Sequence, residues 1–332
     1  MKAILDKLIN HQALGREEAR QVLLEVTSGK HNASQMSAFM TVYMMRAISL
    51  HELGGFREAM LEVCRPVQLD RPAMDVCGTG GDGKNTFNIS TLSAFVVAGA
   101  GQPVAKHGNY GVSSVSGSSN VMEYFGFRFS ADADKLQKTM DKTGMMFMHA
   151  PLFHPAMKNV APIRKELGVK TFFNMLGPMV NPASPPRQLV GVFSLELARH
   201  YAYLYQGLGK SFVILHDLQG YDEVSLTGPV KVYSNEGEMM VRPSDFGLSE
   251  VSPESIRGGA TVEASAEIFM SVLKGEGTRQ QTDVVLANAA LSLYAAGVVK
   301  TLPDGVALAG ESLLSGKAFR KFEAITALST ED

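Results

Sequence analysis

Residues Met74–Asp82 read MDVCGTGGD, a short apolar segment followed by a glycine-rich turn that an acid closes. The apolar part predicts a buried strand over Met74–Cys77, and the glycines predict a tight turn directly after it. Glycine adopts positive φ without steric cost and lets the backbone approach a ligand closely. Successive N–H groups in such a turn form a concavity that attracts phosphate oxygens. The stretch therefore predicts either a plain tight turn or a phosphate-binding turn.

Strands and helices alternate from residue 72 onward. Short apolar segments predict five buried strands, at Met74–Cys77, Val104–Lys106, Met145–His149, Leu189–Phe193 and Phe212–His216. Helical patterns lie between them, at Thr91–Ala100, Val121–Phe125, Ala133–Lys142 and Leu195–Leu208. This alternation predicts an α/β domain over residues 71–332 with a mostly parallel central sheet. We expect a hairpin of Lys231–Tyr233 and Met239–Val241 to be appended to the sheet, and a helical tail over Thr282–Leu328.

The first 70 residues have a different, wholly helical pattern. Apolar residues recur at three- and four-residue steps on one predicted helix face, namely Met36, Phe39, Met40, Tyr43 and Met44. Ser49 and Glu52 form a capping-box signature at the start of another helix. We predict a small domain of about four helices over residues 1–70. A helical return segment at about 155–175, which includes Ala156–Leu167, is expected to fold back onto it.

Composition limits the possible partners. The chain has 332 residues, 31 Lys plus Arg and 33 Asp plus Glu, for a net charge of −2. This balance gives no reason to expect nucleic acid or an anionic membrane as a partner. Cys64 and Cys77 are too few for a disulfide framework or a cysteine metal site. No signal peptide is recognisable, and the longest apolar run, 284–299, is too short to span a bilayer, so we predict a cytoplasmic protein.

Three further polar segments follow the glycine turn within forty residues. Asn88–Thr91 stands where a helix should begin, so its side chains could cap the helix or help its free N–H groups to bind an anion. Lys106–Asn109 follows a predicted strand, at the sheet edge where α/β proteins bind ligands, although a solvated lysine is the simpler alternative. Ser113–Ser119 reads as an ordered anion loop or as a plain linker. Together these segments favour a ligand with more than one phosphate group.

Charged residues outside these loops supply two further candidates. Asp222 and Glu223 are adjacent acids soon after a predicted strand. They are either solvated or hold Mg²⁺, which proteins bind through one or two carboxylates plus substrate phosphates. Arg164 lies in the return segment and either faces solvent or forks a planar carboxylate.

In this order, the motifs resemble those of the anthranilate phosphoribosyltransferase family. The segments that carry the resemblance are Gly78–Asp82, Asn88–Thr91, Lys106–Asn109, Ser116–Ser118, Phe173–Pro178, Asn181–Pro182 and Asp222–Ser225. The resemblance extends from about residue 10 to the C-terminus. It implies a fold of the nucleoside phosphorylase/phosphoribosyltransferase-like, glycosyltransferase family 3 type. It also implies Mg²⁺-dependent transfer of phosphoribose from phosphoribosyl pyrophosphate (PRPP) to the amine of anthranilate, the second step of the tryptophan branch, and a homodimer formed through the helical domain.

The same resemblance implies a set of site residues. Those expected on PRPP are Gly78, Gly81, Asp82, Thr86, Asn88, Ile89, Ser90, Thr91, Lys106, His107, Gly108, Asn109, Ser113, Ser114 and Ser118. Two Mg²⁺ ions are expected, one on Ser90 and the other on Asp222 and Glu223. Anthranilate is expected against Gly78, Asn109 and Arg164. No residue is assigned as a general base.

The chain departs from the commonest family pattern at a few positions. Tyr110 and Gly111 replace an arginine and a small residue, and Asn120 replaces an aspartate, so a phosphate contact by residue 110 is in question. Two alternatives remain. A pyrimidine nucleoside phosphorylase-like enzyme would be longer and would have Lys-x-Ser in place of residues 106–109, and a non-catalytic phosphate-binding relative would have lost the acids or gained a basic surface.

Overall fold

The structure, a computed structural model, describes residues 1–111 and 114–331. The chain divides into two compact units. The helical unit comprises Met1–Val67 and Ala150–Ser184, and the α/β unit comprises Gln68–His149 and Pro185–Asp332. No helix within the described residues has an apolar stretch of the length needed to cross a lipid bilayer.

A seven-stranded sheet forms the centre of the α/β unit, with the strand order β3-β2-β1-β4-β5-β6-β7. Its strands are β1 (Met74–Gly78), β2 (Val104–Gly108), β3 (Met145–His149), β4 (Arg187–Gly191), β5 (Ser211–Asp217), β6 (Val230–Ser234) and β7 (Gly237–Val241). The first five strands pair in parallel, and β6 and β7 are antiparallel additions at one edge. Because β1 lies between β2 and β4, the turn after β1 emerges at the middle of the sheet edge, where parallel sheets bind ligands.

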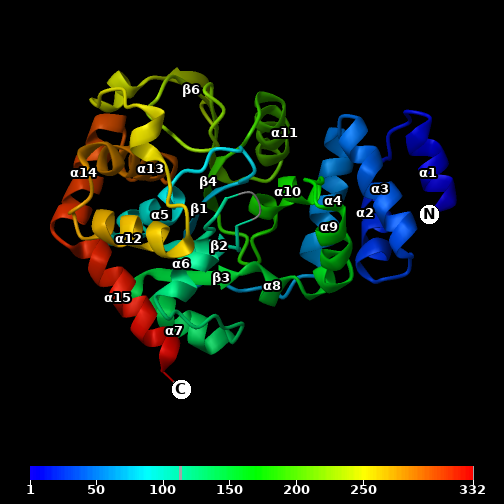
Figure 1. Cartoon of the computed structure of the whole chain (residues 1–332), viewed down its shortest axis with the longest axis horizontal. Coiled ribbons are helices and arrows are strands. Elements are labelled where there is room, and N and C mark those ends of the chain that lie inside the picture. Colours follow the sequence, from blue (N-terminus) through cyan, green and yellow to red (C-terminus); the bar gives the residue numbers. More distant parts are fainter. Residues whose placement is uncertain (112–113, 332) are drawn as a thin grey trace. The chain divides into compact units, whose positions relative to one another are not determined.

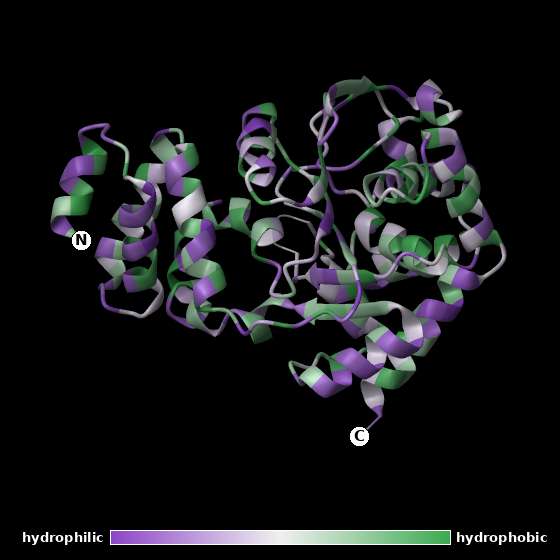
Figure 2. Ribbon diagram, turned by 180° about the vertical axis from the view of Figure 1, so that it is seen from behind, coloured by the Kyte–Doolittle hydropathy of each residue, from purple (hydrophilic) through white to green (hydrophobic). Residues whose placement is uncertain are grey.

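Helices cover the sheet on both faces. They are α5 (Ile89–Gly99), α6 (Ser118–Tyr124), α7 (Ala133–Thr143), α11 (Leu195–Gln206), α12 (Val262–Leu273), α13 (Arg279–Ala295), α14 (Leu302–Leu314) and α15 (Lys317–Thr330), with short 3₁₀ turns η3 (Pro243–Phe246) and η4 (Pro253–Ile256). Figure 1 shows α5, α12 and α13 grouped on one side of the strands and α11 on the other. In Figure 2, hydrophilic and hydrophobic residues alternate along the outer helices α7 and α15, as expected for helices with one face on the core.

The predicted α/β fold is confirmed, and the differences lie at the element boundaries. All five predicted strands and the hairpin are present, although β4 begins and ends two residues before the predicted Leu189–Phe193. Helix α12 is absent from the sequence prediction, even though the side chain of Thr261 caps its N-terminus as such residues commonly do.

The helical unit combines four N-terminal helices with a return segment. The helices are α1 (Lys2–Ile9), α2 (Arg16–Thr27), α3 (Ala33–Met45) and α4 (Leu50–Glu62). The return segment contains α8 (Ala150–Phe153), η1 (Pro155–Asn159), α9 (Ala161–Leu167), α10 (Phe173–Leu176) and η2 (Gly177–Val180). Phe172 of this segment stacks on Phe56 of α4 at 4.6 Å between ring centroids and meets Phe39 of α3 edge-on at 5.7 Å. Aromatic packing therefore attaches the return segment to the N-terminal helices.

One detail of the predicted apolar face on α3 is wrong. Met36, Phe39, Met40 and Tyr43 are buried, but Met44 is 44% exposed. Each helical residue is rotated by 100° from the one before it, so Met44, four residues after Met40, lies about 40° beyond the edge of the face at Met40.

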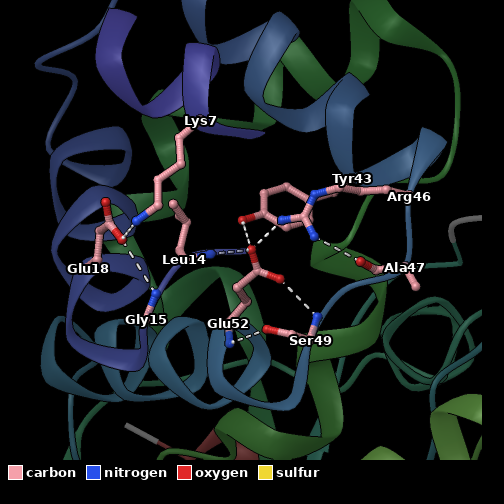
Figure 3. A network of polar contacts seen from close by, with 9 residues as sticks. All are labelled: Lys7, Leu14, Gly15, Glu18, Tyr43, Arg46, Ala47, Ser49 and Glu52. Atoms are coloured by element: carbon pink, nitrogen blue, oxygen red, sulfur yellow. Dashed lines mark hydrogen bonds and ion pairs between the residues drawn. The ribbon is translucent and has the colours of Figure 1, made fainter. Parts of the chain in front are cut away.

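The predicted capping box at Ser49 is present and belongs to a larger polar network (Figure 3). One carboxylate oxygen of Glu52, Oε1, accepts hydrogen bonds from Leu14 N–H at 3.0 Å, from the Tyr43 hydroxyl at 3.0 Å and from the Arg46 guanidinium. The other, Oε2, accepts from Ser49 N–H at 2.8 Å. Burial alone would raise the pKa of Glu52, but these donors outweigh it and hold the pKa below its ordinary value.

Candidate active site

The site begins at the turn that follows β1. Gly80 and Gly81 have φ values of +64° and +77°, so the predicted left-handed glycine turn is present. A loop between β5 and β6, residues 218–229, carries Asp222 and Glu223 to this turn. We call this segment the acidic loop. All of these residues belong to the α/β unit.

Asp222 lies directly against the glycine turn. Its Oδ2 accepts a hydrogen bond from Gly80 N–H at 2.6 Å. A Cβ atom at Gly78 would lie 2.5 Å from Asp222 Oδ2, and one at Gly191 of β4 would lie 1.5 Å from the Asp222 carbonyl oxygen. Both strand ends therefore require glycine because the acidic loop packs against their backbones.

Glu223 points toward the first turn of α5. Its Oε1 accepts from Ser90 N–H at 3.3 Å. Its Oε2 is buried and has no hydrogen-bond partner among residues 1–111 and 114–331. A buried carboxylate oxygen that lacks a partner is costly, and so this atom fits an additional ligand.

The acids of this site are poorly compensated. Burial, together with the nearby Asp82 charge, raises the pKa of Asp222 to about 8. Burial and the charges of Asp222 and Asp82 raise the pKa of Glu223 well above its ordinary value. The positive charge of Lys106 opposes this rise only in part. A cation at the site would relieve the repulsion among the three carboxylates.

Lys106 itself does not extend from the end of its strand. It is 2% exposed, and its Nζ donates to the Val76 carbonyl oxygen at 2.6 Å inside the sheet. Burial lowers the pKa of Lys106, and the charge of Asp75 opposes that effect. The alternative of a solvated lysine is therefore wrong, because the neighbouring strand supplies an acceptor for the buried ammonium.

These residues fit Mg²⁺ that arrives together with a phosphate group. Within the described part of the chain, no cluster of three or more His, Cys, Asp or Glu side chains is arranged to hold a metal ion by itself. Mg²⁺ is usually bound through one or two carboxylates, with waters and substrate phosphates completing the octahedron. Asp222 and the partnerless Oε2 of Glu223 are donors of the required kind.

The serine-rich loop is tied to α5 and α6 at its described positions. Asn88 Nδ2 donates to the Ser116 carbonyl at 3.0 Å, which joins this loop to the start of α5. Asn120 Oδ1 accepts from both Gly111 N–H at 2.9 Å and Gly117 N–H at 3.0 Å, so one amide holds both ends of the loop. The predicted site residue Ser113 lies outside the described residues.

The remaining predicted PRPP residues have the following places. Asn109 N–H donates to Ser118 Oγ at 3.2 Å, and Ser114 Oγ donates to the Ser116 carbonyl at 3.4 Å. Thr86 forms an isolated bridge with Arg257, and Asp82 Oδ1 accepts from Lys84 N–H at 2.9 Å. Ile89 and Thr91 are buried in α5, and His107 and Gly108 belong to β2.

Tyr110, which stands where the family pattern has arginine, is held by neutral and acidic neighbours. Its ring meets His149 edge-on at 4.8 Å, and its hydroxyl donates to Glu123 Oε1 at 3.2 Å. His149 is fixed in turn by Ser119, with 2.8 Å between its Nδ1 and the serine Oγ. The site thus lacks a guanidinium at this position and has an aromatic ring instead.

Arg164 lies in α9 of the helical unit, whereas Gly78 and Asn109 belong to the α/β unit. Its Nη2 donates to Asn174 Oδ1 at 3.3 Å, and its guanidinium carbon lies 5.3 Å from the centroid of the Phe173 ring. Burial lowers the pKa of Arg164 from its ordinary value. These contacts fix the direction of the guanidinium.

The chain is similar to known proteins over almost its whole length. Residues 70–319 match the model of the glycosyl transferase family, a/b domain, and residues 2–64 match its helical bundle domain. An anthranilate phosphoribosyltransferase from Flavobacterium johnsoniae is 59% identical over 331 residues, which cover 99% of this chain and 100% of the relative.

Two solved structures of the Saccharomyces cerevisiae anthranilate phosphoribosyltransferase are also similar. The complex with PRPP and Mg has a TM-score of 0.91 at 29% identity, and the complex with 4-fluoroanthranilate has a TM-score of 0.88 at 28% identity. Each comparison covers 98% of this chain and 96% of the yeast chain. The chain therefore belongs to the anthranilate phosphoribosyltransferase family of glycosyl transferases, as its motifs predicted.

Proposed function

We propose that this chain transfers the 5-phosphoribosyl group of PRPP to the amine of anthranilate in a Mg²⁺-dependent reaction that releases pyrophosphate. This would be the second step of the tryptophan branch. The observation that carries the proposal is the pair of buried, undercompensated carboxylates, Asp222 and Glu223, against a glycine turn and the start of α5. A turn and a helix N-terminus of this kind attract phosphate, and the carboxylates attract the cation that accompanies it.

In this proposal the glycine turn, the start of α5 and the serine-rich loop hold PRPP. The residues assigned to it are Gly78, Gly81, Asp82, Thr86, Asn88, Ile89, Ser90, Thr91, Lys106, His107, Gly108, Asn109, Ser113, Ser114 and Ser118. Two Mg²⁺ ions are assigned, one to Ser90 and the other to Asp222 and Glu223. The hydrogen bond between Ser90 N–H and Glu223 supports neighbouring positions for these ligands.

Cleavage of the bond between ribose C1 and the pyrophosphate oxygen places positive charge on the sugar and negative charge on the leaving group. Bound Mg²⁺ supplies charge stabilisation to that leaving group. The N–H groups of the glycine turn and of the first turn of α5 are fixed donors that act in the same sense, because they need no reorganisation as the charge develops. Lys106 adds a buried positive charge from within the sheet.

The acceptor is assigned to Gly78, Asn109 and Arg164. An aromatic amine is a weak nucleophile, so its alignment with C1 supplies much of the rate. Arg164 is suited to fork the carboxylate of anthranilate, since Asn174 and the Phe173 ring already fix its direction. We expect Arg164→Ala to raise the KM for anthranilate roughly tenfold and to change the KM for PRPP much less. Equal effects on both constants would remove Arg164 from the acceptor site.

We also propose a homodimer formed through the helical unit. Ile9, Met44 and Met45 of this unit are exposed, and Met45 is 82% exposed. Apolar side chains of this size are suited to an interface between subunits. Sedimentation of the purified chain at micromolar concentration should give the mass of two copies, and variants with charged residues at Met44 and Met45 should give the mass of one.

The activity is tested by mixing the purified protein with PRPP, Mg²⁺ and anthranilate and following the loss of anthranilate fluorescence. The proposal expects a loss that requires both PRPP and Mg²⁺. No loss, with PRPP binding intact in a calorimeter, would contradict the proposed acceptor and require a screen of other aromatic amines and bases.

A further inference from the structure

The acidic loop has to be held firmly if its carboxylates are to stay together. Asp82 lies beside the acid pair, because its Oδ2 accepts a hydrogen bond from Asp222 N–H at 3.4 Å, and like charges this close repel one another. A free loop would relieve this repulsion by moving the acids apart into water. Contacts elsewhere on the loop must therefore offset the repulsion.

Asn288 of α13 makes the most specific of these contacts. Its Oδ1 accepts from Val224 N–H at 3.0 Å, and its Nδ2 donates to the Val224 carbonyl at 2.8 Å and to the Val284 carbonyl at 2.8 Å. The side-chain amide thus pairs with both backbone groups of Val224, as a neighbouring strand would. Val224 directly follows Glu223, so this pairing fixes the backbone at the second acid.

Asp217, at the end of β5, holds the same loop from another side. Its Oδ2 accepts from Ser225 N–H at 3.2 Å and from Ser225 Oγ at 2.6 Å, and its Oδ1 accepts from Gln219 N–H at 2.8 Å. Ser225 Oγ also accepts from Thr227 N–H at 3.0 Å. Residues on both sides of the acid pair are therefore tied to one buried carboxylate.

Burying the Asn288 amide costs free energy unless its polar atoms are hydrogen-bonded. Asn288 is 2% exposed and stands in a helix whose neighbouring residues Ala287, Ala289 and Ala290 are fully buried. An apolar residue would pack there without needing any partner. The amide is needed only because the loop brings two backbone groups of Val224 into the same apolar layer.

We propose that Asn288 is a positioning residue for the metal site: by pairing with Val224 it directs the Glu223 carboxylate toward the first turn of α5. The inference rests on the proposed function, in which Asp222 and Glu223 hold Mg²⁺. Groups that orient metal ligands without touching the metal commonly contribute 10- to 100-fold to metal affinity.

Asn288→Leu tests the proposal, because the leucine side chain branches at the same position and has no polar atoms. Mn²⁺ is titrated into the protein in the presence of PRPP, and the free ion is followed by electron paramagnetic resonance. We expect Mn²⁺ binding about tenfold weaker than in the wild type. The rate should also need more Mg²⁺ to reach half its maximum, with a smaller change in the rate at saturating Mg²⁺.

Ser292→Ala is the matched control. Ser292 is buried one turn further along α13, and its Oγ donates to the Asn288 carbonyl at 2.8 Å within the helix. Its loss should lower the thermal midpoint without weakening Mn²⁺ binding more than about twofold. Unchanged Mn²⁺ affinity in a folded Asn288→Leu protein, or an equal loss in Ser292→Ala, would overturn the proposal.

Ser225→Ala serves if Asn288→Leu does not fold. This variant removes a single hydroxyl that links Asp217 with Thr227, and it should weaken Mn²⁺ binding about threefold. Wild-type Mn²⁺ affinity in this variant would then count against a loop held for metal binding.

The double variant Asp222→Asn, Glu223→Gln distinguishes a failure of the metal assignment from a failure of the role of Asn288. Wild-type Mn²⁺ binding by this double variant would remove the metal assignment itself and the proposal with it, whereas lost binding there together with full binding in Asn288→Leu would remove only the role of Asn288.

Discussion

Glu52 of the helical unit and Asp222 of the α/β unit are both buried carboxylates, yet their surroundings shift the pKa in opposite directions. Glu52 accepts hydrogen bonds from four residues, one of them the arginine Arg46 (Figure 3). Its pKa is lowered. Asp222 accepts from the turn at Gly80 but lies beside a second acid, Asp82, and its pKa is raised to about 8.

The difference separates an acid whose charge the fold compensates from one whose charge it leaves poorly compensated. A buried charge persists in a stable protein when neighbours supply the donors and the counter-charge that water would have supplied. Glu52 has both within its own unit. Asp222 and Glu223 lack sufficient counter-charge within the described residues, and the cation of the proposed function would supply it.

Replacing both acids of the second site should have the largest effect. Asp222→Asn with Glu223→Gln should lower the rate roughly 1,000-fold at limiting Mg²⁺, because the leaving group loses its metal. The thermal midpoint should stay the same or rise, since two repelling buried acids become neutral. Calorimetry and the fluorescence assay measure the two quantities, and wild-type kinetics would show that the metal assignment is wrong.

Neutralising Glu52 of the helical unit should have the opposite result, a loss of stability with no loss of activity. Glu52→Gln leaves Arg46 partly buried without its partner and should lower the free energy of unfolding by about 3 kcal/mol. The rate per folded molecule should not change. Glu58→Gln on the same helix is the control, because the Glu58 pair with Arg16 is solvent-exposed and should contribute less than about 1 kcal/mol. A loss of activity without a loss of stability in Glu52→Gln would break the contrast.

The buried histidine His154 extends the comparison of buried ionisable groups to the pH dependence of stability. His154 donates from Nε2 to the Val180 carbonyl at 3.0 Å, and burial lowers its pKa to about 4 from the ordinary 6.5. The native state therefore prefers neutral His154. Its contribution to the free energy of unfolding is complete above pH 6.5 and is lost as the pH falls toward 4, because the unfolded state binds the proton first. The loss should reach about 3 kcal/mol, since each pKa unit is worth about 1.4 kcal/mol.

Urea unfolding of the wild type and of His154→Gln at pH 7 and pH 4 measures this effect. Glutamine can still donate to the carbonyl but does not titrate, so the variant should lose less stability on acidification. Parallel losses in the two proteins would show that His154 does not contribute.

The smallest effect is expected where a cation is added beside the second site. Tyr110→Arg restores the charge that is commonest in the family, next to Glu123. We expect activity within about threefold of the wild type, because Lys106 and bound Mg²⁺ already supply positive charge. Tyr110→Phe, which keeps the ring against His149, is the control. A large gain in affinity for PRPP in the arginine variant would show that the surroundings of residue 110 lack positive charge, as do those of Asp222 and Glu223.

The strands and most helices could be predicted because their signals are local. Apolar runs, glycine turns and caps such as Ser49 act within a few residues of the chain, so Met145–His149 was predicted to the residue. The glycine turn and the acid pair could also be predicted as separate polar segments, each with a plain structural alternative.

The contacts that join them could not be predicted in the same way. Gly80 and Asp222 are 142 positions apart, and the need for glycine at residue 191 arises only from the packed acidic loop. Asn288 is conspicuous as an amide in an apolar run, but its partner Val224 is 64 positions away. Lys106 shows the same limit, because the carbonyl that holds it belongs to the neighbouring strand.

Gly78 and Gly191 are ladder partners at the ends of β1 and β4, and each lies against Asp222. The space that Asp222 occupies is therefore kept open by glycines in two distant parts of the sequence. Replacing either glycine by a residue with a side chain would displace the acidic loop, so any such substitution at either strand end requires the loop to move first. The acid and its two glycines should thus be inherited together, as a block, even in descendants that have changed their acceptor.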